Sequence, residues 1–224
     1  MAKNFTIKTT TKIDDAANFI VNSILNQLKL NKHVLFFVTG GSSVSVGSKV
    51  AELLAREKLD NLTIMLTDER YGPLNHKDSN WYRLTQKGFS LPGAVSIPIL
   101  IGEDIDITTE KFNRVLEKEF EKAEYKIGSF GIGPDGHTAG ILPSSVAVES
   151  KDLACHYNTP TFSRITITPI TIQKFDEVVA WVQGKAKWGV MEDLEKKDIE
   201  IIKQPAQILK KIPLLTIFTD YNKK

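Results

Sequence analysis

The stretch FGIGPDGHTAG, residues 130–140, combines a phosphate-binding spacing with groups that move protons. Its glycines follow the spacing G-x-G-x-x-G: Gly131, Gly133 and Gly136. That spacing lets a backbone turn approach a cofactor pyrophosphate. Asp135 and His137 add a carboxylate and an imidazole, which could accept a proton from a reacting water. The turn is therefore either a cofactor cradle or the catalytic turn of an enzyme that needs no cofactor.

The place of this turn in the chain argues against a dinucleotide cofactor. A dinucleotide fingerprint lies in the first strand–helix–strand unit and opens a long helix. Here the turn lies past the middle of the chain, and Pro143 leaves little room for that helix. The segment that follows, DLACHYN, begins with its acid instead of closing a strand with one. We therefore predict no cofactor and assign the glycines to tight turns and close approach to a ligand.

The segment TGGSS is a better candidate for binding an anion. Gly40 and Gly41 allow backbone N–H groups to point inward, and the helix that starts near Val44 adds the positive end of its dipole. Ser42 and Ser43 add hydroxyl donors. The segment lacks the lysine of a nucleoside-triphosphate loop. An ordinary strand-to-helix turn capped by serine is the alternative.

Loops with reactive side chains follow four predicted strands. The strand and loop pairs are VLFFV with TGGSS, TIMLT with DER, SFGIG with PDGH, and VVAWV with QGKAK. Ligands of parallel sheets bind beyond the carboxyl ends of the strands. Because these four loops carry glycines, hydroxyls, acids, arginine, histidine and lysine, we expect a functional cleft where they meet.

The elements that position these loops alternate between strand and helix. The first predicted helix covers 14–29 and follows a capping box of Thr11 and Asp14. A second helical stretch follows TGGSS and ends at about Arg56, and a short helix follows the polar loop DERYGPLNHKDSN. A fourth helix is predicted over 107–124. The core side of the last helix is predicted to carry Ile107, Phe112, Val115, Leu116 and Phe120. Strands are predicted over 34–38, 62–67, 95–99, 127–133, 164–168, 177–182 and 213–218. Continuous apolar strands separated by helices predict an α/β domain, residues 1–224, with a mostly parallel sheet flanked by helices on both faces.

Composition argues against several classes of partner. The chain is 42% hydrophobic and 25% charged, which is ordinary for a globular domain. A net charge of +2 without a basic arm argues against nucleic acid, and the apolar runs are too short to span a membrane. A single cysteine, Cys155, and no leader pattern favour a cytoplasmic setting. No Cys/His/Asp set has zinc spacing, so we predict no metal.

Five motifs together resemble one family. GIGPDGHTAGILP is similar to the G-x-G-x-D-G-H-T-A-S-L-F-P signature of 6-phosphogluconolactonases. DER with the later SN, GGSS, RITIT and GKAK resemble further motifs of that family, in the family's order, between about residues 34 and 190. The resemblance implies a Rossmann-like α/β fold of the NagB/RpiA/CoA-transferase-like type. It also implies a sugar-phosphate substrate and hydrolysis of 6-phosphogluconolactone to 6-phosphogluconate in the pentose phosphate pathway.

The resemblance assigns the chemistry to the glycine turn. His137 would activate a water that attacks the lactone carbonyl, and Asp135 would orient the ring or the water. Arg70 would face the sugar hydroxyls or the phosphate, or stabilise the oxyanion. Asp68 and Asn80 would shape that loop. From the residues alone, a structural histidine and a surface turn of the Asx type are the alternatives.

The resemblance also assigns the phosphate site. Ser42 or Ser43, Arg164 and Lys187 would bind the sugar phosphate, with Lys187 preferred over Lys185 by its spacing from the glycine of GKAK. Arginine and lysine suit a dianion because both give charge-assisted hydrogen bonds. Without the resemblance, a solvent-exposed arginine at a strand edge is the alternative for Arg164.

Three features depart from the family pattern. The threonine-proline of the phosphate loop is replaced by Ser43-Val44, which could loosen phosphate binding. Gly140 stands where the family has serine, and Trp188 stands where a small residue is usual. These two could reshape the pocket and alter substrate preference.

Two other functions fit parts of the pattern. Glucosamine-6-phosphate deaminases share the fold, and Asp68 could serve as their proton-transfer base. They carry G-H-I-A-F-N-E-P and D-E-Y where this chain has GHTAGILP and DER, so the glutamate near His137 is missing. A non-catalytic sugar-phosphate sensor is the second alternative, although no helix-turn-helix or basic arm precedes residue 34.

Overall fold

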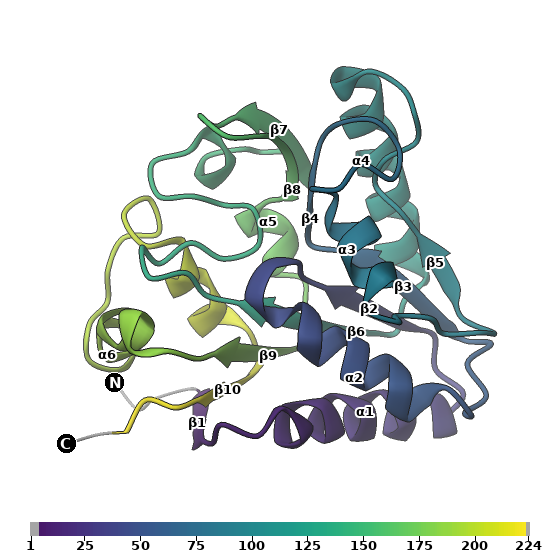
Figure 1. The fold of residues 1–224 in the computed structure, drawn as a ribbon, viewed down its shortest axis with the longest axis horizontal. Coiled ribbons are helices and arrows are strands. Elements are labelled where there is room, and N and C mark those ends of the chain that lie inside the picture. The colour runs from purple at the N-terminus through teal and green to yellow at the C-terminus, as the bar shows by residue number, and fades with distance from the viewer. Residues whose placement is uncertain (1–4, 223–224) are drawn as a thin grey trace.

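Two sheets form the framework of the computed structural model, which describes residues 5–222 but not the side chain of Ser42. The main sheet has the strand order β1-β10-β9-β6-β2-β3-β5, and every neighbouring pair is parallel. Its strands are β1 (Phe5–Thr9), β2 (Val34–Val38), β3 (Leu62–Leu66), β5 (Val95–Ile97), β6 (Tyr125–Gly131), β9 (Glu177–Val182) and β10 (Leu214–Thr219). The small sheet, at the top of Figure 1, is antiparallel and consists of β4 (Asp68–Arg70), β8 (Ser163–Ile167) and β7 (Ala154–Asn158).

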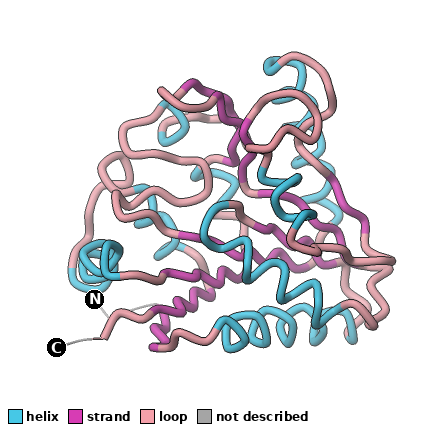
Figure 2. The backbone as a smooth tube through the Cα atoms, in the orientation of Figure 1, coloured by secondary structure: helices cyan, strands magenta, loops and turns pink. Residues whose placement is uncertain are grey.

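Helices connect most of these strands (Figure 2). The α-helices are α1 (Ile13–Lys29), α2 (Val44–Leu54), α3 (Asn80–Gln86), α4 (Ile105–Lys122), α5 (Pro169–Ile172) and α6 (Trp188–Lys196). Short 3₁₀ turns are η1 (Gly41–Ser43), η2 (Val146–Val148), η3 (Lys185–Lys187) and η4 (Pro205–Lys211). Two of these turns, η1 and η3, stand directly before α2 and α6 and close to the ends of β2 and β9.

Helices cover both faces of the main sheet, as the sequence predicts. Successive side chains of a strand point to opposite faces. Phe37 of β2 packs on Phe120 of α4, with ring centroids 5.7 Å apart. The strand register places Phe218 of β10 on the other face, where it meets Phe19 of α1 at 5.6 Å. The helices α1 and α4 therefore lie on opposite faces, and α2 lies beside α1 (Figure 1).

The order in which the chain adds strands to the main sheet reverses at its centre, between β2 and β6. From β2 the chain proceeds outward through β3 to β5, and from β6 it proceeds the other way through β9 to β10. Such a reversal separates the loops that follow the two central strands and leaves a crevice at their carboxyl ends. The loops after β2, β3, β6 and β9, which carry the predicted chemistry, therefore meet at one place.

Some predicted elements were wrong in their sheet or extent. RITIT was predicted within the parallel sheet but forms β8 of the antiparallel sheet. DER was predicted as loop but forms β4, and neither β1 nor β7 was predicted. A short apolar segment does not show which sheet it will join, because parallel and antiparallel partners bury it equally well.

Two local predictions about helices were also wrong. Ile107 was placed on the core side of α4, but it lies in the first helical turn and is 38% exposed. The capping box of Thr11 and Asp14 does not form. The helix α1 begins at Ile13, its N-cap residue is Lys12, and no side chain caps it. Thr10 takes part instead: its hydroxyl donates to Asp15 at 2.5 Å and accepts the backbone N–H of Lys12.

Candidate active site

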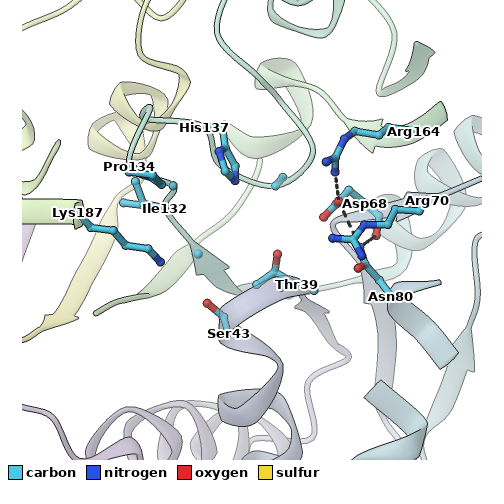
Figure 3. Close-up of a pocket in the computed structure, with 15 residues that line it drawn as sticks. Thr39, Ser43, Asp68, Arg70, Asn80, Ile132, Pro134, His137, Arg164 and Lys187 are labelled. Atoms are coloured by element: carbon cyan, nitrogen blue, oxygen red, sulfur yellow. Dashed lines mark hydrogen bonds and ion pairs between the residues drawn. The ribbon is translucent and has the colours of Figure 1, made fainter. Parts of the chain in front are cut away.

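A cavity of about 320 Å³ opens at the carboxyl ends of the central strands (Figure 3). It is lined by most of the residues predicted for the site: Gly40, Gly41, Ser43, Asp68, Arg70, Asn80, His137, Arg164 and Lys187. Asp135 lies behind His137, and the side chain of Ser42 lies outside the described part of the structure. Thr39, Gly131, Ile132, Gly133, Pro134 and Ala139 complete the lining.

The turn after β6 holds the imidazole of His137 against its own backbone. Gly136 adopts a left-handed φ of 81°, and the turn is closed by a hydrogen bond from the N–H of Gly133 to the carbonyl of His137 at 2.9 Å. A Cβ atom at Gly133 would collide with the imidazole ring and with the carboxylate of Asp135. This glycine is therefore needed for close approach of the ring.

Asp135 fixes the orientation of the imidazole ring. A carboxylate oxygen of Asp135 lies 2.5 Å from Nδ1 of His137 and also accepts the His137 backbone N–H at 3.2 Å. Because an ionised carboxylate only accepts hydrogen bonds, Nδ1 must carry the proton, and Nε2 of the neutral ring keeps its lone pair. Burial alone would raise the pKa of Asp135, but the hydrogen bonds and positive charge of His137 lower it overall. The pair thus holds a base at the cavity.

The loop after β2 supplies backbone and hydroxyl donors on another side of the cavity. Gly41 has a left-handed φ of 65°, and a Cβ atom at Gly40 would collide with Asn80. Ser43 precedes α2, but its side chain makes no capping hydrogen bond. Its hydroxyl is buried and has no hydrogen-bond partner within the described structure. Since a buried hydroxyl without a partner costs free energy, the ordinary capping turn does not explain Ser43.

The aspartate of DER lies buried between several donors. One oxygen of Asp68 accepts the hydroxyl of Thr67 at 2.9 Å, and the other lies 3.3 Å from Nδ2 of Asn80 and 3.6 Å from the guanidinium of Arg164. Asn80 also donates to the backbone carbonyl of Asp68 at 3.0 Å. Asp68 and Asn80 therefore shape this wall of the cavity, and the surface Asx turn that was the alternative does not form.

Glu69, between the two site residues of DER, anchors the start of α3. It is fully buried, and its carboxylate accepts the hydroxyl of Ser79 at 2.9 Å. It also accepts three backbone N–H groups, those of Arg70, Asn80 and Trp81. Burial raises its pKa, and these hydrogen bonds oppose that rise. Glu69 therefore holds Asn80 and Arg70 in place without touching the cavity.

Two arginines face each other across the small sheet. Arg70 of β4 and Arg164 of β8 are direct partners in the antiparallel register. Burial lowers the pKa of Arg70, and the nearby charges of Arg83 and Arg164 lower it further. In Figure 3 both guanidinium groups approach the cavity from the side of Asp68. Arg164 is therefore not the solvent-exposed strand-edge arginine that was its alternative; its side chain is only 17% exposed.

Lys187 reaches the cavity from the opposite side, in the turn before α6 (Figure 3). Gly184, with a left-handed φ of 101°, starts that turn. Burial lowers the pKa of Lys187, and the carboxylate of Asp220 partly opposes this. The unusual Trp188 has a structural partner, since its indole N–H donates to Asp220 at 3.1 Å. As predicted from the spacing, Lys187 lines the cavity and Lys185 is not among its lining residues.

The other two departures lie in tightly packed surroundings. Val44 is buried at the start of α2. A Cβ atom at Gly140 would lie 2.9 Å from Cβ atoms of both Asp68 and Thr166, so a serine there would need its neighbours to move. The backbone N–H of Gly140 donates to the hydroxyl of Thr166 at 3.1 Å. Gly140 therefore lets the segment after His137 pack directly on the wall formed by Asp68.

One supporting residue had no signal in the sequence. Tyr157 of β7 donates its hydroxyl to the carbonyl of Gly140 and accepts the N–H of Leu142 at 3.3 Å. It pairs with Arg164 in the small sheet. Tyr157 thus connects the segment after His137 to the strand that carries Arg164. Because β7 was not predicted, no sequence pattern indicated that this tyrosine lies near the site.

Among residues 5–222, no group of three or more His, Cys, Asp or Glu side chains could hold a metal ion. No helix in that same range is long and apolar enough to cross a membrane.

Comparisons with known proteins agree with the motifs. The model of one protein family, glucosamine-6-phosphate isomerases/6-phosphogluconolactonase, matches residues 8–215. The 6-phosphogluconolactonase of Borreliella burgdorferi is 26% identical over 92% of this chain and 93% of that protein. The 6-phosphogluconolactonase of Thermotoga maritima is 26% identical over 82% of this chain and 86% of that protein.

The crystal structure of the Thermotoga maritima enzyme gives a TM-score of 0.78 with 20% identity, over 96% of this chain and 99% of that chain. The structure of 6-phosphogluconolactonase from Trypanosoma brucei gives a TM-score of 0.75 with 18% identity, over 96% of each chain. At such identities the likeness concerns the fold, and it confirms the predicted Rossmann-like α/β class.

Proposed function

This chain belongs to the family of glucosamine-6-phosphate isomerases and 6-phosphogluconolactonases, and we propose that it hydrolyses 6-phosphogluconolactone to 6-phosphogluconate. The family predicted from the motifs is confirmed by the match over most of the chain. The predicted enzyme class, a hydrolase of carboxylic esters, is confirmed at the level of the relatives, which are 6-phosphogluconolactonases. The roles of individual residues belong to the proposal.

The contact between His137 and Asp135 carries the proposal. The 2.5 Å hydrogen bond to Nδ1 leaves Nε2 as the only ring nitrogen able to accept a proton. The ring lies on a cavity that also holds two arginines and a lysine. A neutral base beside a cationic anchor suits a substrate that combines a hydrolysable lactone with a phosphate dianion.

The reaction follows from this arrangement. Nε2 of His137 accepts a proton from a water whose oxygen attacks the lactone carbonyl carbon, which gives a tetrahedral oxyanion and an imidazolium. Asp135 stabilises the imidazolium. Backbone N–H groups of the glycine turn, or Arg70, stabilise the oxyanion. The bond from the carbonyl carbon to the ring oxygen then breaks, and that oxygen takes the proton from the imidazolium. The products are a free hydroxyl and the acid.

The phosphate is bound by the loop after β2 together with Arg164 and Lys187. The hydroxyl of Ser43, which has no hydrogen-bond partner among the described residues, and the backbone of Gly40 and Gly41 in the cavity lining would be the donors to the anion. Both cationic side chains line the same cavity, and half-burial of each reduces competition from water. Ser42 is the alternative hydroxyl donor.

The deaminase alternative is less well supported. Its base would be Asp68, but both oxygens of that carboxylate already have partners, Thr67 on one and Asn80 and Arg164 on the other. A base for carbon acids needs a free lone pair directed at the substrate. Nε2 of His137 meets that requirement, whereas three of the roughly four lone-pair sites of Asp68 already face donors, so Asp68 is the less suitable base.

A direct assay tests the function. Purified protein is given 6-phosphogluconolactone and glucosamine 6-phosphate separately, and release of acid and of ammonium is followed against an enzyme-free blank. We expect acid release above the blank and no ammonium. Ammonium release alone would establish a deaminase, and no reaction with either substrate would favour a sensor.

The remaining expectations from the sequence stay predictions. These are that residues 1–224 form one domain, that the protein binds no nucleic acid, and that the protein with its single cysteine, Cys155, resides in a reducing cytoplasm.

A further inference from the structure

The two arginines of the small sheet pose an electrostatic problem. Arg70 and Arg164 are opposite each other in register, and like charges at directly opposite positions destabilise a sheet. One carboxylate, Asp68, contacts Arg164 at 3.6 Å, and Arg70 donates to the backbone carbonyl of Asp78 at 3.3 Å. The Nε–H groups of both arginines are buried and have no hydrogen-bond partner within residues 5–222. Each arginine thus has only one such acceptor contact among the described residues, which leaves room for a second kind of contact to hold these side chains beside the cavity.

The ring of Phe162 lies against both guanidinium groups. Its centroid is 4.8 Å from Cζ of Arg70 and 5.9 Å from Cζ of Arg164. Both distances are within the range of a cation–π contact. The two arginines line the cavity and Phe162 does not, so the ring supports them from behind.

The turn that carries Phe162 is itself fixed. Phe162 and Thr159 close the connection between β7 and β8 with hydrogen bonds in both directions. The N–H and the hydroxyl of Thr159 both donate to the carbonyl of Phe162 at 2.8 Å, and the N–H of Phe162 donates back to the Thr159 hydroxyl at 3.0 Å. The backbone that carries the ring therefore has a set position relative to β8.

An aromatic ring can hold an arginine in a way that a carboxylate cannot. It attracts the guanidinium through its face, whereas the N–H donors lie in the guanidinium plane and remain available to an anion. A carboxylate in the same place would occupy those donors and neutralise the charge. A ring that braces two arginines thus keeps both the positive charge and the donors for an incoming ligand.

We propose that Phe162 is a positioning residue for binding of the phosphorylated substrate, which acts by holding the guanidinium groups of Arg70 and Arg164 toward the cavity. This inference rests on the proposed function for the identity of the ligand. The ring itself touches no substrate and takes no part in proton transfer. Its loss should therefore weaken binding of the phosphorylated ligand. The chemical step should stay nearly unchanged if backbone N–H groups of the glycine turn, and not Arg70, stabilise the oxyanion.

The test compares Phe162→Leu with Phe162→Tyr. Leucine keeps an apolar side chain but removes the π face, and tyrosine keeps the ring. For Phe162→Leu we expect the Kd for 6-phosphogluconate, measured by calorimetry, and the KM for the lactone to rise about 5- to 30-fold, as loss of two cation–π contacts implies. The kcat should stay within about 3-fold of the parent if Arg70 serves the phosphate, and a larger fall in kcat would show that Arg70 also stabilises the oxyanion. Phe162→Tyr should keep the parental Kd.

Phe19→Leu is the matched control. Phe19 carries the same kind of contact, with Nζ of Lys8 4.4 Å from its centroid, but it lies on α1 away from the cavity. This variant should bind 6-phosphogluconate like the parent even if it melts at a lower temperature. If it loses as much affinity as Phe162→Leu, a general loss of stability explains both results and the proposal is wrong.

A double-mutant cycle tests whether Phe162 acts through the arginines. In an Arg70→Gln background, Phe162→Leu should cost clearly less affinity than in the parent, because the closer of the two contacts is already lost. An undiminished cost would overturn the proposal, as would parental affinity in Phe162→Leu. Phe162→Met serves in place of Phe162→Leu if the latter does not fold.

The outcomes for Phe162 and for the function are distinguishable. Binding of 6-phosphogluconate and of inorganic phosphate does not depend on turnover. A parent protein that binds both but hydrolyses no lactone would refute the function and leave the proposal for Phe162 standing. A parent that binds neither would refute the proposal for Phe162.

Discussion

Replacing Asp135 with asparagine should impair turnover without impairing phosphate binding. The carboxylate accepts the Nδ1–H of His137 at 2.5 Å and so leaves Nε2 free as the base. An asparagine amide of the same shape could donate to Nδ1 instead. The proton of the ring would then lie on Nε2, and the base would be lost in that fraction of molecules.

The size of the effect follows from the contact that is removed. A hydrogen bond to a charged group contributes about 1.5–3 kcal/mol. The carboxylate is needed most when the imidazolium forms, so its loss acts mainly on the transition state. With a factor of ten for each 1.36 kcal/mol or so, kcat should fall about 10- to 150-fold. Binding of 6-phosphogluconate should stay within a few-fold, because Arg164 and Lys187 are unchanged.

The assay for Asp135→Asn is the initial rate of acid release from 6-phosphogluconolactone after subtraction of the enzyme-free rate. Asp106→Asn is the matched control, since Asp106 contacts Nε2 of His156 at 3.3 Å in a second His–Asp pair outside the cavity. The control should keep the parental kcat. Parental kcat in Asp135→Asn would show that ring orientation does not depend on this carboxylate.

Three further changes test other parts of the site. Arg164→Ala and Lys187→Ala should each raise the Kd for 6-phosphogluconate about 10- to 150-fold by calorimetry, since each deletes a charge-assisted contact; parental Kd in both would place the phosphate elsewhere. Lys187 is charged only below its pKa, and burial lowers that pKa from the ordinary 10.5, so affinity for 6-phosphogluconate should begin to fall at a lower pH than for an exposed lysine. A Lys187→Arg variant should remove this alkaline loss, and an identical pH profile would contradict the assignment. Gly133→Ala should lower kcat on the order of 100-fold because its Cβ would displace the ring of His137, and a parental kcat would show that the ring tolerates the shift.

The sequence predicted the parallel strands of the main sheet better than the small sheet. The apolar runs that became β2, β3, β9 and β10 are buried on both faces, which gives them a continuous hydrophobic pattern. The strand β4 has three residues, all polar, and β7 alternates weakly. Their pairing depends on β8, far away in sequence, and so it leaves no local pattern.

The turn that brings Asp135 and His137 together was predictable because its parts are close in sequence. Asp135 and His137 are two residues apart, and the glycines that allow their contact lie in the same turn. The supports of the site come from elsewhere in the chain. Tyr157 reaches Gly140 from β7, and Phe162 reaches both arginines from the turn before β8. These contacts depend on the register of the small sheet, which residue types and spacing do not reveal.

Glu69 illustrates a second limit. A glutamate inside a polar motif resembles a catalytic acid. The carboxylate of Glu69, however, accepts hydrogen bonds from three backbone N–H groups and one hydroxyl around the start of α3. Only the path of the chain after β4 shows that these donors converge. The motif therefore contains both a cavity wall, Asp68, and an anchor for that wall, Glu69.

The proposed activation of water by His137 is tested most directly by the variant His137→Asn. Asparagine keeps a polar side chain but removes the base, and loss of a general base typically costs about 10²- to 10⁴-fold in rate. The measurement is the initial rate of 6-phosphogluconolactone hydrolysis above the enzyme-free blank, together with the Kd for 6-phosphogluconate. We expect His137→Asn to lose most enzymatic hydrolysis and to keep a Kd for 6-phosphogluconate within a few-fold of the parent. Hydrolysis at the parental rate in His137→Asn would show that His137 does not activate the water.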